Sequence, residues 1–196
     1  MSEPQAFIDD LARVGVAVES PWDLVNTRQP YPAAIPVLLD WLNRVDTEVP
    51  ADDRRRFREA LVRALTVRAA RRVAAPALIR EFHRVDASPG LRWAVGNSLE
   101  TVADDSVFDE LVALTQNQSY GSARQMVVLA LGRMKDPRAV DVLIGLLNDD
   151  DVTGHAVAAL GRLRAPQARP ALEPFLDHPR PWVRKEAKKA LARLPE

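Results

Sequence analysis

The chain has 196 residues, of which 47% are hydrophobic and 28% charged, and this is the balance of an ordinary globular protein. Its formal net charge is zero, so it has no charge excess that would attract nucleic acid or a membrane surface. The absence of cysteine excludes disulfides, thiolate metal ligands and cysteine nucleophiles. No run of about 18 apolar residues is present, and the acidic N-terminus differs from a signal peptide, so we expect a cytoplasmic protein without a membrane span.

The first 30 residues are expected to form an N-terminal helical cap, with helices at 3–14 and 21–28. Ser20 and Pro21 predict the start of the second helix, because serine caps a first helical turn and proline fits the first helical position. Neither helix carries the leucine pattern that follows. Since the ends of a stacked helical array need a polar outer face, we expect residues 1–30 to cover one end of residues 31–196.

Residues 31–196 contain an internal repeat, which is visible where VLALGRMKDPRAVDVLIGLL is aligned with VAALGRLRAPQARPALEPFL. Anchor leucines recur every 29 to 34 residues, at Leu65, Leu99, Leu131, Leu160 and Leu191. Such a period accommodates two short helices and two turns. Residues 46–53 are expected to be an insertion between the helices of the first full repeat. The expected helices are 32–45, 52–67, 71–84, 89–103, 106–116, 121–134, 137–148, 152–163, 167–177 and 180–194.

Two further features keep the register of the repeat. Pro36, Pro76 and Pro170 stand two residues before a second leucine column that marks the other helix of each hairpin. A proline inside a helix costs about 3 kcal/mol and bends the helix, so these prolines predict kinked first helices. Gly132 and Gly161 directly follow anchor leucines, which predicts close packing of adjacent helices.

The last repeat resembles the HEAT family, and the bacterial short HEAT-like or PBS-lyase-type repeats in particular. The residues that carry this resemblance are Pro181, Trp182, Val183, Arg184, Ala187, Ala190 and Leu191. The resemblance covers about residues 31–194. It implies an all-α fold in which about five helical hairpins stack into an α-α superhelix, or armadillo-like solenoid, with the second helix of each hairpin on the concave side.

Arginines stand seven residues before four of the anchor leucines, at Arg58, Arg92, Arg124 and Arg184. They are compatible with a basic ridge that follows a phosphate backbone. The same register in HEAT repeats holds structural arginines that pair with acids in the turn of the neighbouring repeat, and we favour this second interpretation.

The concave face is the candidate binding surface. Columns two and six residues before each anchor leucine, and two residues after it, should point there. Trp93 beside Leu129, with arginines around them, has the composition of a protein interface, in which an aromatic anchor is surrounded by a polar rim. The candidate partner-binding residues are Trp93, Asn97, Gln125, Leu129, Arg133, Arg162, Lys185 and Lys189.

The residue pattern offers no catalytic set, cofactor site or metal site. His83, His155 and His178 fall in three different repeats and lack the spacing of metal ligands. Phosphate-binding glycine loops are absent as well. We therefore expect a protein that is not an enzyme.

The hypothesis that follows is a monomeric, non-catalytic scaffold, adaptor or inhibitor that binds a partner protein on its concave face. One alternative is a HEAT-like DNA-binding protein or alkylpurine DNA glycosylase, since that family uses a concave tryptophan. Here Asn97 stands one turn after Trp93, and an amide cannot stabilise a developing sugar cation as a carboxylate does. Another alternative is a bilin-lyase-like protein, for which no residue marks a tetrapyrrole site.

Overall fold

The computed structural model describes residues 4–195, and this part of the chain is all-α, with helices joined by turns and no β-strand. Its α-helices are α1 (Gln5–Arg13), α2 (Pro21–Asn26), α3 (Ile35–Glu48), α4 (Ala51–Ala64), α5 (Ala75–His83), α6 (Pro89–Val102), α7 (Phe108–Gln116), α8 (Gln125–Leu131), α9 (Ala139–Gly145), α10 (Thr153–Leu163), α11 (Arg169–Leu172) and α12 (Pro181–Leu191). Its 3-10 helices are η1 (Pro32–Ala34), η2 (Arg68–Ala70), η3 (Asp105–Val107), η4 (Gln118–Arg124), η5 (Leu146–Asn148), η6 (Pro166–Ala168) and η7 (Glu173–Asp177).

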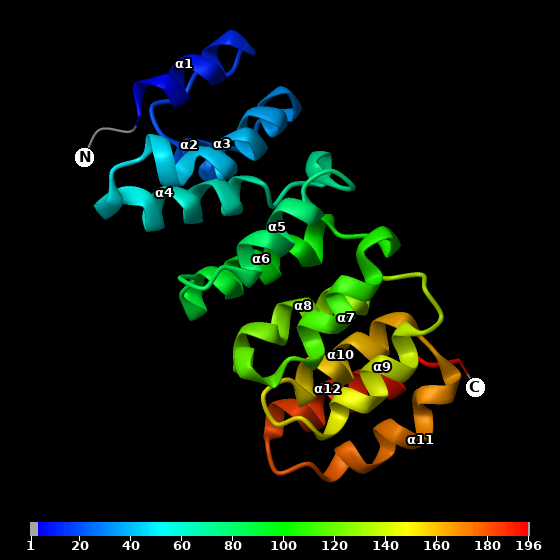
Figure 1. Cartoon of the computed structure of the whole chain (residues 1–196). Coiled ribbons are helices and arrows are strands. Elements are labelled where there is room, and N and C mark those ends of the chain that lie inside the picture. The colour runs from blue at the N-terminus through cyan, green and yellow to red at the C-terminus, as the bar shows by residue number, and fades with distance from the viewer. Residues whose placement is uncertain (1–3, 196) are drawn as a thin grey trace.

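The helical hairpins stack one after another in a single row, from the N-terminal end at the upper left of Figure 1 to the C-terminal end at the lower right. The second helices of successive hairpins pack on each other, α4 on α6, α6 on α8, α8 on α10 and α10 on α12. This arrangement confirms the predicted α-α solenoid. No helix in residues 4–195 is both long enough and apolar enough to cross a bilayer.

The two leucine columns form the core of the stack. Leu65, Leu99, Leu131 and Leu160 are fully buried, whereas the last anchor, Leu191, is only partly buried at the end of the array. The second column is also fully buried, at Leu38, Leu78, Leu111, Leu143 and Leu172. Burying a leucine side chain stabilises a fold by about 2 kcal/mol, so these columns hold each hairpin together and join it to the next.

Glycine makes the closest helix contacts in the C-terminal half. A Cβ atom added to Gly132 would lie 2.7 Å from both Cα and Cβ of Ala159, and one added to Gly161 would lie 2.7 Å from the same atoms of Ala190. Real Cβ atoms do not approach so closely. The predicted close packing is thereby confirmed, and α8, α10 and α12 meet almost backbone to backbone.

The three prolines begin helices, so the prediction that they kink helix interiors is wrong. Pro36 is the second residue of α3, Pro76 the second of α5 and Pro170 the second of α11. A proline in a first turn has no hydrogen bond to lose, because the first N–H groups of a helix have no partner within the helix. Asp109 and Asp141 take equivalent first-turn positions in α7 and α9, where a carboxylate favours the helix dipole.

The expected insertion at 46–53 is also wrong, since this stretch is mostly helical. α3 continues to Glu48 and α4 begins at Ala51, so only Val49 and Pro50 lie between them. Val49 is buried and closes the turn against the core. The polar residues that suggested a loop instead lie on the solvent side of longer helices.

Aromatic side chains join the first helices to the stack. Phe7 of α1 packs edge-on against Trp41 of α3 and Phe57 of α4, with ring centroids 5.4 and 5.1 Å away. α2 packs against α4, and Ser20 caps α2 as predicted, within a capping box that Asp23 completes. The assignment of residues 1–30 to a cap stays a prediction. The expected limits at residue 3 and residue 196 lie outside the described residues.

Candidate partner-binding surface

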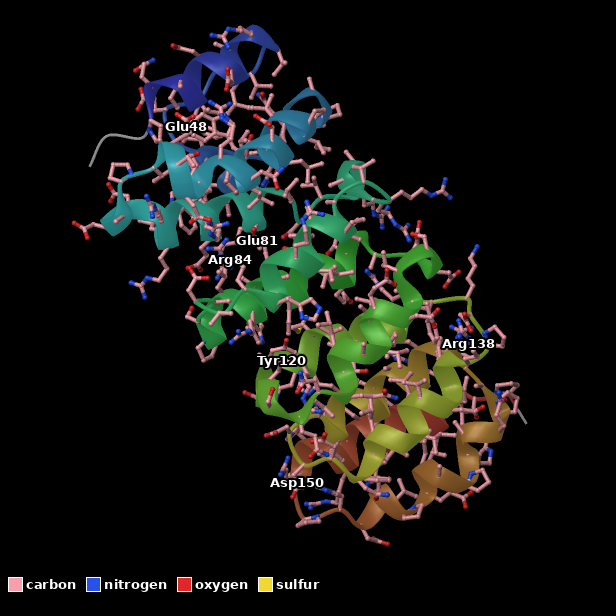
Figure 2. All side chains as sticks on the ribbon, viewed as in Figure 1. Glu48, Glu81, Arg84, Tyr120, Arg138 and Asp150 are labelled. Carbon is pink, nitrogen blue, oxygen red and sulfur yellow. The ribbon has the colours of Figure 1, made fainter. Side chains whose placement is uncertain are left out.

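Two arginines of the predicted column are buried and bind acids, which confirms their structural role. Arg58 donates to both carboxylate oxygens of Glu81, at 3.0 and 2.9 Å, and to Asp46 at 2.8 Å. Figure 2 shows Glu81 beside Arg84, a second arginine that contacts Asp46. Burial raises the pKa of Glu81, and the positive charge of Arg58 opposes that shift.

Arg124 has the same structural role further along the stack. It is fully buried, donates to the carbonyl of Thr115 in its own hairpin at 2.9 Å, and binds Asp149 of the next repeat at 2.7 Å. The hydrogen bonds from Arg124 lower the pKa of Asp149. A buried guanidinium with these partners is inaccessible to a phosphate backbone.

The other two arginines of the column bind carbonyls rather than acids. Arg92 donates to the carbonyl of Phe82 at 3.0 Å, and Arg184 to that of His178 at 2.7 Å. Both carbonyls lie at the end of the first helix of the hairpin, where helical partners are missing. The predicted acid pairing is thus wrong for these two arginines within residues 4–195. In all four hairpins, however, the arginine ties the second helix to the first.

The candidate residues on α6 and α8 are unequally exposed. Trp93 is 42% exposed, while Asn97, Gln125 and Leu129 are partly buried. The side-chain amide of Gln125 donates to the carbonyl of Asp151 at 2.8 Å, so this side chain links α8 to the following repeat. Trp93 is therefore the residue in this group with most surface to offer a partner.

The structure brings Arg133 and Arg162 together around a carboxylate that the sequence analysis did not single out. Glu100 of α6 accepts hydrogen bonds from Arg162 at 2.7 Å and from Arg133 at 3.4 Å. Arg133 also donates to the Glu100 carbonyl at 2.9 Å. Both guanidinium groups remain partly exposed, so one carboxylate is shared by two cations, neutralises only one of the two charges and covers neither group.

On α12, Lys185 and Lys189 are both exposed. Lys189 forms an ion pair with Glu186 at 2.8 Å, whereas Lys185 has no ion pair within the described part of the chain. Neither lysine is among the residues that line the two hollows beside Arg133 and Arg162.

Arg133 and Arg162 lie in a groove at the C-terminal ends of the second helices. Two adjoining hollows of about 820 Å³ each form it and share Arg71, Ala103 and Arg133. We call it the basic groove, and its charged lining consists of the cations Arg68, Arg71, Arg72, Arg133, Lys135, Arg162 and Arg193 and the acids Glu100, Asp104 and Asp105.

Sequence reasoning missed most of the basic groove. Arg68, Arg71 and Arg72 belong to the turn between repeats, which precedes the first helix of the next hairpin and carries no periodic signal. A signal was present in the matching triplets Leu-Gly-Arg and Leu-Ala-Arg, which end at Arg133, Arg162 and Arg193. Residues in one register of a stacked array lie on one edge of it.

Trp182 is a second exposed aromatic residue that was not among the candidates. It lies on α12, is 44% exposed, and rests on α10 at Gly154, where an added Cβ would lie 2.1 Å from its ring. The His155 ring packs edge-on against it, at 5.4 Å between centroids. The absence of a side chain at Gly154 is the sequence feature that makes room for this ring.

No group of three or more histidine or acidic side chains that could hold a metal ion occurs among residues 4–195. His83 contacts Tyr120, His155 contacts Trp182, and His178 stacks on Phe175. The three histidines thus have separate aromatic neighbours.

Comparisons with known proteins support this description of the fold. No curated protein is significantly similar to the chain in sequence. An engineered protein, a target of the Northeast Structural Genomics Consortium, superimposes with a TM-score of 0.56 at 15% identity, over 98% of this chain and 96% of that one. A designed armadillo repeat protein gives a TM-score of 0.47 at 17% identity, over 90% and 100% of the two chains. The model of the HEAT repeats family matches residues 75–154 and 149–196, which is more than half of the sequence, and the chain therefore belongs to the HEAT-repeat family.

Proposed function

We propose that this protein is a monomeric, non-catalytic scaffold that binds a partner protein across the face formed by its second helices, as an adaptor or an inhibitor. Solenoids of stacked helical repeats commonly mediate protein–protein interactions and are generally non-enzymatic. The observation that carries the proposal is the exposure of Trp93, a large aromatic residue that is 42% exposed on a helix whose other large apolar residues are buried.

An exposed tryptophan on a second helix favours a binding role. Tryptophan is enriched among the few residues that supply most of the binding energy of an interface, because burying its ring removes much apolar surface from water. Trp182 offers a second ring of similar exposure on α12, further along the stack. Two such anchors on second helices of the stack favour a partner that lies along several repeats.

The test is to crosslink and purify the partner from the source cell, identify it, and repeat the binding with purified proteins by calorimetry. Trp93→Ala is expected to weaken binding at least tenfold, since truncating an interface anchor costs more than about 1 kcal/mol. Lys185→Glu is expected to weaken it less. Val85→Ala is the matched control, because Val85 is fully exposed in the turn between α5 and α6. Unchanged affinity for both Trp93→Ala and Trp182→Ala would contradict the proposal.

A further inference from the structure

We propose that the basic groove binds an acidic peptide segment. Its carboxylates would bind the guanidinium groups of Arg133 and Arg162, which both donate to Glu100 in this structure. The inference rests on the proposed function, because the segment would belong to the partner protein. It concerns a different surface from Trp93, however, and assigns that surface a ligand of stated chemistry.

Three arginines in one register form one wall of the basic groove. Arg133, Arg162 and Arg193, which we call the arginine ladder, each stand two residues after an anchor leucine, at the ends of α8, α10 and α12. These three helices pack side by side in order. Successive members of the arginine ladder are therefore separated by one helix-to-helix step, which is about 8–10 Å in packed helices, and the glycine contacts favour the short end of that range.

The turn between α4 and α5 supplies further cations. Arg68 and Arg71 are exposed and have no ion pair within residues 4–195, whereas Arg72 lies 3.4 Å from Asp104. Arg72 has a φ of 72°, a conformation that costs an arginine energy and that glycine or asparagine adopts more readily. Cations that are left unpaired here raise the electrostatic potential of the basic groove.

Glu100 shows how a ligand carboxylate would sit. Its two oxygens accept hydrogen bonds from Arg162 and Arg133, so a single carboxylate already bridges two members of the arginine ladder. The lining has seven cations against three acids, which leaves an excess of positive charge for a ligand to neutralise. Guanidinium groups bind carboxylates with directed, often bidentate, hydrogen bonds.

The lining favours a peptide over a nucleic acid. Among the residues that the structure describes, no aromatic side chain lines the two hollows, so unpaired bases would find no ring there on which to stack. Glu100, Asp104 and Asp105 would repel a continuous phosphate backbone, and the chain as a whole has no positive charge excess. An acidic peptide can place its carboxylates between these acids.

The arginine ladder also implies a spacing for the acids of the ligand. A polyproline II peptide rises about 3.1 Å per residue with three residues per turn, so every third side chain points the same way about 9 Å further along. This rise matches one helix-to-helix step of the arginine ladder. The groove should therefore prefer acids at every third position, with each carboxylate between two neighbouring arginines as Glu100 lies between Arg133 and Arg162.

The experiment uses a fluorescein-labelled ten-residue peptide with glutamate at every third position and proline or glycine between, and a copy with glutamine in place of glutamate. Fluorescence anisotropy should show binding of the glutamate peptide only, weaker in 300 mM than in 50 mM NaCl. Arg162→Gln is expected to weaken binding at least fivefold, while Arg80→Gln, the same charge change at an exposed site on α5, should leave it unchanged. Glu100→Gln should strengthen binding severalfold, because it frees two guanidinium groups.

Equal binding of the two peptides, or unchanged affinity of the Arg162→Gln protein with circular dichroism showing it folded, would overturn the inference. Tighter binding of a ten-nucleotide single-stranded DNA through the same arginines would also overturn it, in favour of a nucleic-acid ligand. These outcomes differ from failure of the proposed function. If binding of the partner depends on Trp93 and not on Arg162, the proposed function is supported and the acidic-peptide proposal is contradicted. If binding depends on Arg162 and not on Trp93, the proposal that Trp93 anchors the partner is contradicted.

Discussion

The two ends of the stack are joined by opposite means. Around α1, α3 and α4, the large rings of Phe7, Trp41 and Phe57 fill the space between helices. Between α8, α10 and α12, Gly132 and Gly161 have no side chain and let the backbones touch. One architecture is thus reached by filling a wide gap at one end and by leaving no gap at the other.

This difference coincides with the extent of the match to the family model. The family model matches residues 75–196, where small residues recur in register, and does not cover the segment that holds the aromatic cluster. Small residues at helix contacts are constrained because any added atom collides with backbone. A gap filled by rings has more chemical solutions, so its residues form no regular pattern.

Replacement of Trp41 by alanine should have the largest effect on stability. Trp41 is fully buried, and removing such a ring leaves a cavity that costs about 3–5 kcal/mol of unfolding free energy. The change also removes the indole N–H that Asp10 accepts at 2.9 Å. Urea unfolding followed by circular dichroism measures the loss. Trp93→Ala, at an exposed ring, is the control and should cost less than half as much. Equal losses would show that the aromatic cluster does not hold the N-terminal helices.

Addition of one methyl group at the other end should have the next largest effect. Gly132→Ala and Gly161→Ala each place a Cβ 2.7 Å from an alanine backbone atom, and such overpacking costs about 1–3 kcal/mol. Gly145→Ala is a matched control on α9, where an added Cβ meets nothing within 4 Å. It should stabilise the protein by about 0.5–1 kcal/mol, because alanine loses less backbone freedom than glycine on folding. The same urea titration measures all three variants, and a stabilising Gly161→Ala would refute the close contact.

The smallest expected effect is a difference in the pH at which each end loses stability. Burial lowers the pKa of His155 below its ordinary value of 6.5, and its Nδ1 atom is buried without a hydrogen-bond partner. The folded chain therefore binds this proton less readily than the unfolded chain. The contribution of neutral His155 is complete above pH 6.5 and declines as the pH falls from 6.5 toward the folded-state pKa.

Asp10 at the N-terminal end responds in a lower range. The hydrogen bond from Trp41, followed by that from Arg44, lowers the pKa of Asp10 below its ordinary value of 3.8. Its contribution is complete above about pH 4 and is lost as the pH falls below 3.8. Thermal melts of wild type, His155→Gln and Asp10→Asn at pH 7.5, 5.5 and 3.5 separate the two groups. His155→Gln should reduce the loss between pH 7.5 and 5.5, and Asp10→Asn should not. The reverse pattern would contradict the assignment.

The repeat architecture could be predicted from sequence because it depends on residues whose spacing is itself the signal. The leucine columns, the serine caps at Ser20 and Ser88, and the close approach at Gly132 and Gly161 all follow from local rules on burial, capping and packing. The buried arginines were found in the same way, since Arg58 and Arg124 share a register.

Features that depend on distant neighbours could not be predicted. The spacing of the prolines fits both a kink inside a helix and the start of a helix. At Pro36, the 3-10 turn that precedes α3 distinguishes the second case from the first. The contact between Glu100 and Arg162 joins residues two repeats apart, and Arg71 reaches the same groove from an irregular turn. Periodicity reports which face of a helix is buried and does not report which side chains meet across the edge of the array.

Gly132 and Gly161 immediately precede Arg133 and Arg162 in the chain. The two glycine contacts therefore help to set the spacing of the arginine ladder, Gly132 between Arg133 and Arg162, and Gly161 between Arg162 and Arg193. A methyl group at Gly161 would push α10 and α12 apart and lengthen the step from Arg162 to Arg193. Under the proposed peptide binding, the preferred spacing of ligand acids would then depend partly on Gly161, which is not among the residues that line the basic groove.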